Sequence, residues 1–342
     1  MNKNLEHFGK ERNTNIEIFR VFLMFIILFH HFFSHGLIIG KIGSEELPLS
    51  FENNVSASIH LLTHFGVVGF MFISSYYGIS LRISKVCKLW FQLLFYSFFI
   101  VLGYSFYTQS YSFFQFFQSF FPLRIWWFCK YYFLIMLLSP IINDGISNIS
   151  KNRFSIIIIC IGIILLFSRF ILRESSFNLD LLLYVYILGR YLRKYPINWI
   201  ENYCISIFLV TSIVLFCLPL LFLRFQKVIY LSFLWSNNNI LVFIQAISCF
   251  YIFLHHKPFF KRRITIASNV LAVYLITDHP IVRGILWSNV YGVTFFYQKT
   301  NSLFIVILLL VTIFCICLVI DKVREIIISP FSKYLVKLDE LF

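Results

Sequence analysis

The sequence predicts an all-α fold, a polytopic membrane helix bundle of about ten transmembrane helices, and three features of its composition support this. Of the 342 residues, 59% are hydrophobic and 13% are charged, whereas soluble proteins contain about 45–50% apolar and about 25% charged residues. The 44 phenylalanines outnumber the 15 acidic residues, and a water-soluble fold leaves too much surface to hide them all. The same richness in aromatic residues excludes a disordered chain.

Ten stretches of the chain are apolar enough to cross a membrane as helices, because a span needs about 20 mostly apolar residues. They cover residues 16–35, 59–80, 89–107, 125–142, 154–172, 179–192, 203–223, 237–254, 264–287 and 303–321. The sequence contains no internal repeat, low-complexity linker or soluble segment between them. We therefore expect one integral-membrane domain over residues 1–342.

The basic residues are divided unevenly between the two sides that these spans define. With the N-terminus in the cytoplasm, 19 of the 29 Lys and Arg residues fall on inner segments, nine at or near outer ends, and Arg20 inside the first span. Such an excess on the cytoplasmic side orients membrane proteins. Both termini are therefore expected in the cytoplasm, with the chain in the cell inner (plasma) membrane. The same pattern accounts for the net charge of +14, so the expected partner is the lipid bilayer and not a nucleic acid.

The first predicted span carries ionisable side chains at membrane depth, where they are costly and usually functional. Arg20 and His31 are eleven residues apart, close to three helical turns, so they share one face with about 16 Å between them. His30 points about 100° away from that face. In the structural alternative, Arg20 extends to lipid phosphates and His31 forms a hydrogen bond with a neighbouring helix.

The ninth predicted span contains a second polar group, Asp278-His279-Pro280 followed by Arg283. Pro280 breaks the helix there, and the freed backbone groups are tolerated only in a protein interior or a wet cavity. Counting from the start of each outward-running span places Asp278 at about the depth of His31. We expect Asp278, His279 and Arg283 in or beside the cavity of His31. Asp278 would either orient His31 or pair with Arg283.

His60 and His64 lie four residues apart, on one face of the second predicted span. A pair of this kind can bind zinc. However, no Asp, Glu or Cys stands at a useful spacing as a third ligand, and none of the eight Cys residues forms a CxxC motif. We therefore expect no metal in this protein.

Four blocks of the chain, taken in order, resemble the signature motifs of the acyltransferase-3 family of membrane acyltransferases. They are Arg20 and His31 with ten residues between them; Gly66–Ser74; Trp126-Trp127-Phe128 with Tyr131, Tyr132 and Leu138-Ser139-Pro140; and Tyr274-Leu-Ile with Asp278-His279-Pro280, Arg283 and Trp287. Together they extend over about residues 15–290. Two positions depart from the family pattern, which usually has Gly where this chain has Ser75 and commonly has His where it has Thr277.

The resemblance implies a bacterial enzyme that moves an acyl group, usually acetyl from acetyl-CoA, to a hydroxyl of an envelope polysaccharide or lipid-linked glycan. In this reading His31 is the general base or acyl carrier, and Arg20 binds the developing oxyanion or the CoA phosphates. Further candidates are Asp278 and His279 for catalysis, Arg283, Tyr76, Ser74, Trp127, Tyr131 and Tyr274 for substrate binding, and Arg20, Arg82, Lys85 and Lys88 for CoA binding. The alternative is a transporter or flippase of a lipid-linked sugar or anionic solute, with the same buried charges along its path.

Overall fold

The regular structure of the chain is helical. The computed structural model describes residues 13–167, 179–225, 231–235, 239–257, 265–296 and 302–338. Within these ranges, an isolated bridge between Ile42 and Leu47 is the single β contact. The all-α prediction is therefore confirmed for the described residues.

The helices follow one another along the chain with mostly short connections. They are α1 (Thr14–His31), α2 (Phe51–Leu62), α3 (Phe65–Tyr77), α4 (Ile83–Thr108), α5 (Phe113–Ser119), α6 (Trp127–Asn148), α7 (Lys151–Phe167), α8 (Leu179–Lys194), α9 (Asn198–Asn202), α10 (Cys204–Arg224), α11 (Leu231–Leu234), α12 (Ile240–His255), α13 (Leu271–Thr277), α14 (Pro280–Phe296) and α15 (Ser302–Leu338). Short helical turns add η2 (Phe32–Gly36), η3 (Ile39–Lys41), η4 (Pro122–Arg124) and η7 (Thr265–Ser268).

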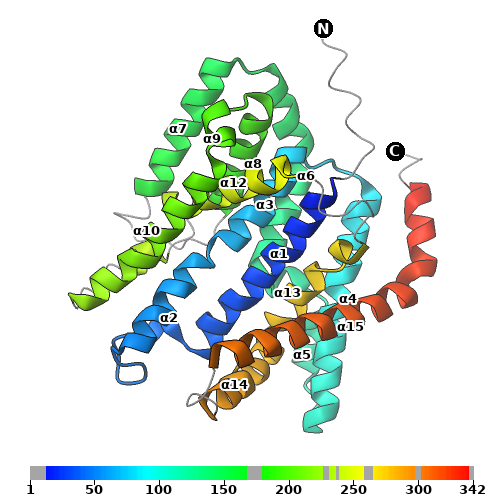
Figure 1. The fold of residues 1–342 in the computed structure, drawn as a ribbon. Coiled ribbons are helices and arrows are strands. Elements are labelled where there is room, and N and C mark those ends of the chain that lie inside the picture. The colour runs from blue at the N-terminus through cyan, green and yellow to red at the C-terminus, as the bar shows by residue number, and fades with distance from the viewer. Residues whose placement is uncertain are drawn as a thin grey trace.

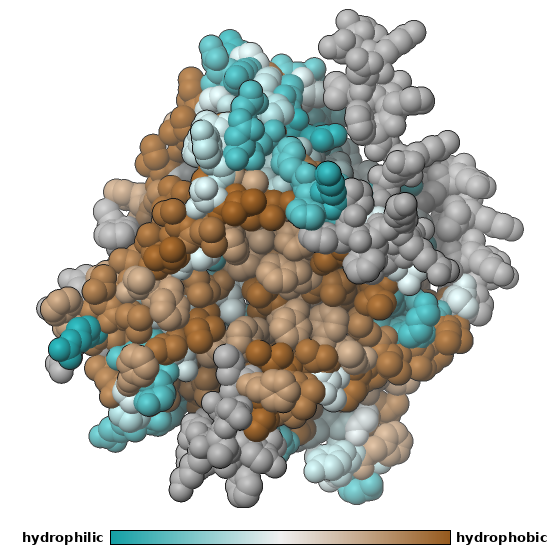
Figure 2. Space-filling view, viewed as in Figure 1, coloured by the Kyte–Doolittle hydropathy of each residue, from teal (hydrophilic) through white to brown (hydrophobic). Residues whose placement is uncertain are grey.

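Among the residues that the structure describes, five helical segments are long and apolar enough to cross a bilayer. They are Thr14–Gly36, Phe51–Tyr77, Ile83–Thr108, Cys204–Arg224 and Phe304–Ser329. Figure 2 shows hydrophobic residues across the middle of the molecule, with hydrophilic residues gathered above and below them. This distribution is that of a membrane protein, because a lipid environment favours an apolar belt between two polar ends. The total of ten spans and the cytoplasmic termini stay predictions.

The predicted spans fall on helices of the structure, although several boundaries move. The second span begins at Phe51 instead of residue 59 and is divided between α2 and α3. The ninth span is divided among η7, α13 and α14, with Pro280 at the first position of α14, where its missing N–H removes no helical hydrogen bond. Residues 168–172, 237–238 and 264 of the predicted spans lie outside the described residues.

Helix α1 occupies the middle of the bundle, where it contacts α3, α12, α13 and α15 (Figure 1). Its side chains Phe19, Leu23 and Leu28 are almost completely buried. Burial of this apolar face holds α1 in place inside the bundle. As a result, the two polar positions predicted to matter, Arg20 and His31, are both carried on a helix that is surrounded by protein.

Candidate active site

Three interruptions of regular helix surround one cavity. After His31, α1 continues into a π-helical turn; α2 and α3 are separated at Thr63–His64, and α13 and α14 at Asp278–His279. Each interruption contributes side chains to the cavity lining. Irregular backbone at membrane depth persists where it lines a cavity or a protein interior, and π-turns are frequent at functional sites.

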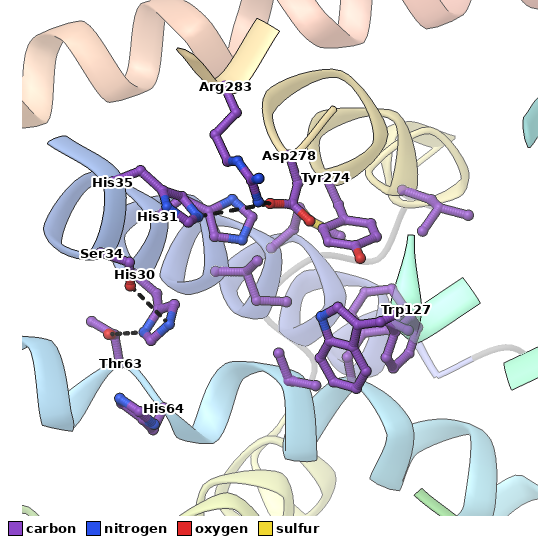
Figure 3. A pocket seen from close by; sticks show the side chains of 16 residues that line it. His30, His31, Ser34, His35, Thr63, His64, Trp127, Tyr274, Asp278 and Arg283 are labelled. Atoms are coloured by element: carbon purple, nitrogen blue, oxygen red, sulfur yellow. Dashed lines mark hydrogen bonds and ion pairs between the residues drawn. The ribbon is translucent and has the colours of Figure 1, made fainter. Parts of the chain in front are cut away.

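We call this space the histidine cavity, and its volume is about 390 Å³. Its polar lining comprises His30, His31, Ser34, His35, Thr63, His64, Tyr274, Asp278 and Arg283, and Trp127 and Phe128 are among its apolar side chains. Figure 3 shows two polar groups, with His31, His35, Asp278 and Arg283 on one side and His30, Thr63 and His64 on the other.

His31 is the last residue of α1 and is 8% exposed. Its ring centroid lies 5.6 Å from that of His35 and 6.1 Å from that of Tyr274. Its Nδ1 atom is buried and has no hydrogen-bond partner among the described residues. Because His31 also lines the cavity, its imidazole is placed where it can act as a general base.

Asp278 lies on the same side of the histidine cavity as His31 (Figure 3) and contacts Arg283 and His35. Its Oδ1 atom is 3.5 Å from Nη1 of Arg283 and 3.8 Å from Nε2 of His35. Of the two roles considered from the sequence, pairing of Asp278 with Arg283 is the arrangement in the structure. Arg283 is 40% exposed at its side chain whereas Asp278 is 10% exposed, so the pair connects the cavity wall with its more open rim.

A second space, which we call the basic cavity, lies nearer the start of α1 and has a volume of about 660 Å³. Arg20, Lys85 and Lys88 line it together with a single acidic residue, Glu17. Lys85 Nζ donates a hydrogen bond of 2.7 Å to Ser80 Oγ. Three cations against one carboxylate make this cavity suitable for an anionic ligand such as a phosphate ester.

The two cavities adjoin along three helices. On α1, Arg20 lines the basic cavity and Met24, one turn later, lines the histidine cavity. On α6, Tyr132 lines the basic cavity and Phe128, one turn earlier, lines the histidine cavity. On α3, Ile73 lines the basic cavity and Phe70, about one turn earlier, lines the histidine cavity. The wall between the cavities is therefore about one helical turn, or roughly 5.4 Å, thick.

The structure brings some of the predicted site residues into these cavities and leaves others outside. Trp127 and Tyr274 line the histidine cavity, and Ser74 lines the basic cavity. Four predicted residues lie outside both cavities. The Tyr76 hydroxyl accepts a 3.3 Å hydrogen bond from Arg193, and Lys130 lies over the Tyr131 ring at 5.0 Å from its centroid. Arg82 is exposed at the N-cap of α4, and His279 lines a third cavity with Gln115 and Arg124.

Sequence reasoning missed several residues of the site. His35 was not singled out, although it follows His31 by one helical turn and contacts Asp278. Tyr77 was also missed, and it lines the basic cavity whereas the neighbouring Tyr76 does not. Of the two adjacent tyrosines in the third sequence block, Tyr132 lines that cavity and Tyr131 does not. The proximity of His30 to His60 and His64 was also missed. The spacing of His31 and His35 was the one available signal, because residues four apart lie on one helix face.

Both departures from the family pattern are buried and locally satisfied. Thr277 Oγ1 donates a 2.8 Å hydrogen bond to Val273 O, and Thr277 O accepts one of 3.3 Å from Trp287 Nε1. Ser75 Oγ donates a 2.7 Å hydrogen bond to Phe72 O. At position 277 the chain therefore offers no imidazole, whereas His31 does line the histidine cavity.

The family model described as an acyltransferase domain matches residues 13–321, which include both cavities. The chain belongs to the acyltransferase-3 family. It is accordingly an acyltransferase and an enzyme, as its four sequence blocks predicted, and membership in this family disfavours the transporter alternative. Neither a curated protein nor a solved structure matches the chain.

Proposed function

We propose that this acyltransferase moves an acyl group, namely acetyl, from acyl-CoA to a hydroxyl of an envelope polysaccharide or lipid-linked glycan in the cell inner membrane. The observation that carries the proposal is the arrangement of two adjoining cavities along α1. One is basic and contains Arg20, and the other contains His31. A donor that is anionic at one end and reactive at the other fits such a pair.

The basic cavity receives the CoA portion of the donor in this proposal. Arg20, Lys85 and Lys88 supply positive charge for its phosphates, and the ring of Tyr132 supplies an aromatic surface. The Cα atoms of Arg20 and His31 are about 16 Å apart by helical rise. Because the two side chains line different cavities, the separation supports phosphate binding by Arg20 over contact with the reacting carbonyl.

The reaction takes place in the histidine cavity. His31 accepts the proton of the acceptor hydroxyl while the hydroxyl oxygen forms a bond to the thioester carbonyl carbon. The resulting tetrahedral intermediate collapses with cleavage of the C–S bond. The leaving thiolate takes the proton from His31, which yields the ester, free CoA thiol and neutral imidazole. Arg283, at the cavity rim, is the cation nearest to the developing negative charge among the residues that line this cavity.

The acceptor sugar enters the histidine cavity from the side opposite the basic cavity. Trp127 and Tyr274 line the cavity, and flat aromatic side chains of this kind stack against the apolar faces of sugar rings. With the N-terminus in the cytoplasm, this side faces the envelope, so a cytoplasmic donor and an external acceptor approach from opposite ends of α1.

The donor half of the proposal is tested without knowledge of the acceptor. Binding of acetyl-CoA and of S-acetyl-pantetheine, which has no phosphates, is measured by calorimetry on the purified full chain. Lys85→Ala and Lys88→Ala are expected to weaken acetyl-CoA binding about tenfold each, as charge-assisted hydrogen bonds contribute about 1.5–3 kcal/mol, and to leave binding of the phosphate-free analogue unchanged. Lys151→Ala, on exposed α7, is the matched control.

The acceptor half is tested by mass spectrometry of envelope glycans from cells with the gene, without it, and with His31→Ala. The expected result is loss of an acetyl ester in the second and third cases. Equal esterification in all three, or movement of a glycan without any covalent change, would overturn the proposed function.

A further inference from the structure

Three histidines from two different parts of the chain meet beside the histidine cavity. His30 comes from α1, His60 from α2, and His64 from the break between α2 and α3. One ring nitrogen of each lies within 4.8 Å of the others, and His60 and His64 are buried. The sequence argument against zinc considered Asp, Glu and Cys as third ligands, whereas the third group here is a histidine from another helix.

Hydrogen bonds to a threonine fix the tautomer of His30. Thr63 Oγ1 donates its proton to His60 O at 2.5 Å, so toward His30 Nδ1, 3.0 Å away, it acts as an acceptor. His30 Nδ1 therefore carries the hydrogen of the neutral ring. This leaves the lone pair of the ring on His30 Nε2, the atom that can bind a metal.

Ser34 fixes His60 in the same way. Its hydroxyl lies 3.2 Å from His30 Nε2 and 2.9 Å from His60 Nε2. With one proton to give, Ser34 donates to the lone pair of His30 Nε2 and accepts from His60 Nε2–H. The lone pair of His60 is then on Nδ1, which is buried and has no hydrogen-bond partner in the described part of the chain.

We propose that His30, His60 and His64 form a three-histidine binding site for a divalent transition metal such as Zn²⁺. Two features beyond proximity support it. Metal-binding histidines typically donate their second ring N–H to an oxygen, which orients the ring, and Thr63 and Ser34 accept such bonds from His30 and His60. Three neutral imidazoles are also a ligand set that suits zinc.

Binding requires a small rearrangement of the rings. Tetrahedral Zn–N bonds of about 2.0–2.1 Å place ligand nitrogens roughly 3.4 Å apart, so the three nitrogens must move closer together. His30 and His60 are stacked at 4.5 Å between centroids, and one of the two rings must turn out of this stack toward the ion. Ser34 then loses its acceptor on His30 and turns its hydroxyl toward the histidine cavity that it lines.

Three protein ligands leave one position of a tetrahedral zinc ion for water or a substrate oxygen. His30 and His64 line the histidine cavity, so that position is accessible from the space where the acceptor is proposed to bind. The metal-binding inference stands on the geometry of the three rings and does not depend on acyl transfer.

The test measures metal binding to the full chain, purified with a tag that contains no histidine and treated with a chelator. After equilibrium dialysis against Zn²⁺, elemental analysis is expected to find about one zinc per chain, and His60→Gln/His64→Gln is expected to lose at least nine-tenths of it. His35→Gln, a change in the same cavity but outside the trio, is expected to keep it. Co²⁺ in place of Zn²⁺ should give the visible absorption of a tetrahedral site in the wild type and not in the double variant.

Substoichiometric zinc in the wild type, or equal zinc in the double variant, would overturn the proposal. Should the double variant fail to elute as a single species, the single changes His30→Gln and His64→Gln provide the same comparison. A chain that binds zinc but transfers no acyl group would refute the proposed function alone, and a chain that transfers acyl groups but fails to bind added zinc would refute the metal site alone.

Discussion

Asp278 Oδ1 lies 3.8 Å from Nε2 of His35, so the carboxylate at the α13–α14 break contacts the π-helical turn that follows His31. The same oxygen is 3.5 Å from Arg283. Asp278 therefore connects α14 to the end of α1 at the point where the proposed base is located. A contact between two breaks in regular helix can position His31 without touching it.

Asp278→Asn is expected to lower kcat of acyl transfer about tenfold and to leave KM for acyl-CoA unchanged. The amide keeps the shape of the side chain but removes the charge that pairs with Arg283, and a shift of about 1.4 kcal/mol corresponds to tenfold in rate. Steady-state kinetics on the purified variant check this. Since CoA is proposed to bind in the other cavity, a rise in KM with kcat intact would contradict the positioning role.

His31→Ala is expected to reduce acyl transfer by at least about 100-fold, the contribution typical of a general base, while the protein remains folded. His30→Ala is expected to be much milder, because His30 lies with Thr63 and Ser34 on the other side of the cavity. Glycan esterification and thermal unfolding are measured side by side. Equal loss of activity from both variants would show that His31 has no special role.

Arg20→Lys is expected to weaken acetyl-CoA binding nearly as much as Arg20→Ala, by about tenfold. A guanidinium binds two phosphate oxygens through a planar fork, and the compact ammonium of Lys does not reproduce that geometry. Binding of acetyl-CoA, with S-acetyl-pantetheine as the reference ligand, gives the measurement. Full binding in Arg20→Lys would mean that Arg20 acts only as a point charge.

The sequence was sufficient for the helical register within α1 and for the common depth of His31 and Asp278, because helix rise is constant. It was not sufficient to choose between adjacent tyrosines. Neighbours on a helix point about 100° apart, and which of them faces a cavity depends on how the helix is rotated by its packing. Tyr76 therefore packs against Arg193 while Tyr77 lines the basic cavity.

Contacts between segments that are distant along the chain could not be predicted from the sequence either. His30 meets His60 and His64 because α1 packs on α3 and the turn η2 after α1 packs on α2, and no spacing in the sequence encodes these tertiary contacts. The division between the two cavities likewise depends on side chains of three helices that meet only in the folded protein. Sequence spacing predicts which residues share a face of one helix, but it does not predict which helices pack together.

Ser75, which replaces the usual family glycine, is matched by a glycine on the helix that packs against it. A Cβ built at Gly189 of α8 would overlap the Ser75 side chain and come within 2.7 Å of its Cβ atom. Gly189→Ala is therefore expected to destabilise the protein by about 1–3 kcal/mol, the usual cost of overpacking. The double variant Ser75→Gly/Gly189→Ala should recover most of this loss. Thermal unfolding in detergent measures both, and a double variant no better than Gly189→Ala alone would show that the two residues are not coupled.

Asp321 of α15 is completely buried and joins three segments of the bundle. It accepts hydrogen bonds from Arg324 Nε at 2.6 Å, from the Tyr96 hydroxyl of α4 at 2.6 Å, and from Asn269 Nδ2, just before α13, at 2.7 Å. Asp321→Asn removes the charge opposite Arg324 and places an amide N–H₂ among donors. Because removing one partner of a buried ion pair leaves the other uncompensated, we expect a loss of about 3–5 kcal/mol in stability.

The same helix offers a matched control in the exposed pair of Lys322 and Glu325, whose Nζ and Oε2 atoms are 2.8 Å apart. Glu325→Gln should leave the unfolding midpoint unchanged, because water and salt screen exposed ion pairs. Both variants are compared by thermal unfolding in the same detergent. If Asp321→Asn behaves like Glu325→Gln, the attachment of α15 to α4 and to the start of α13 rests on apolar packing. A large loss confined to Asp321→Asn would instead show that this buried carboxylate holds α13, and with it the Asp278 end of the histidine cavity, in place.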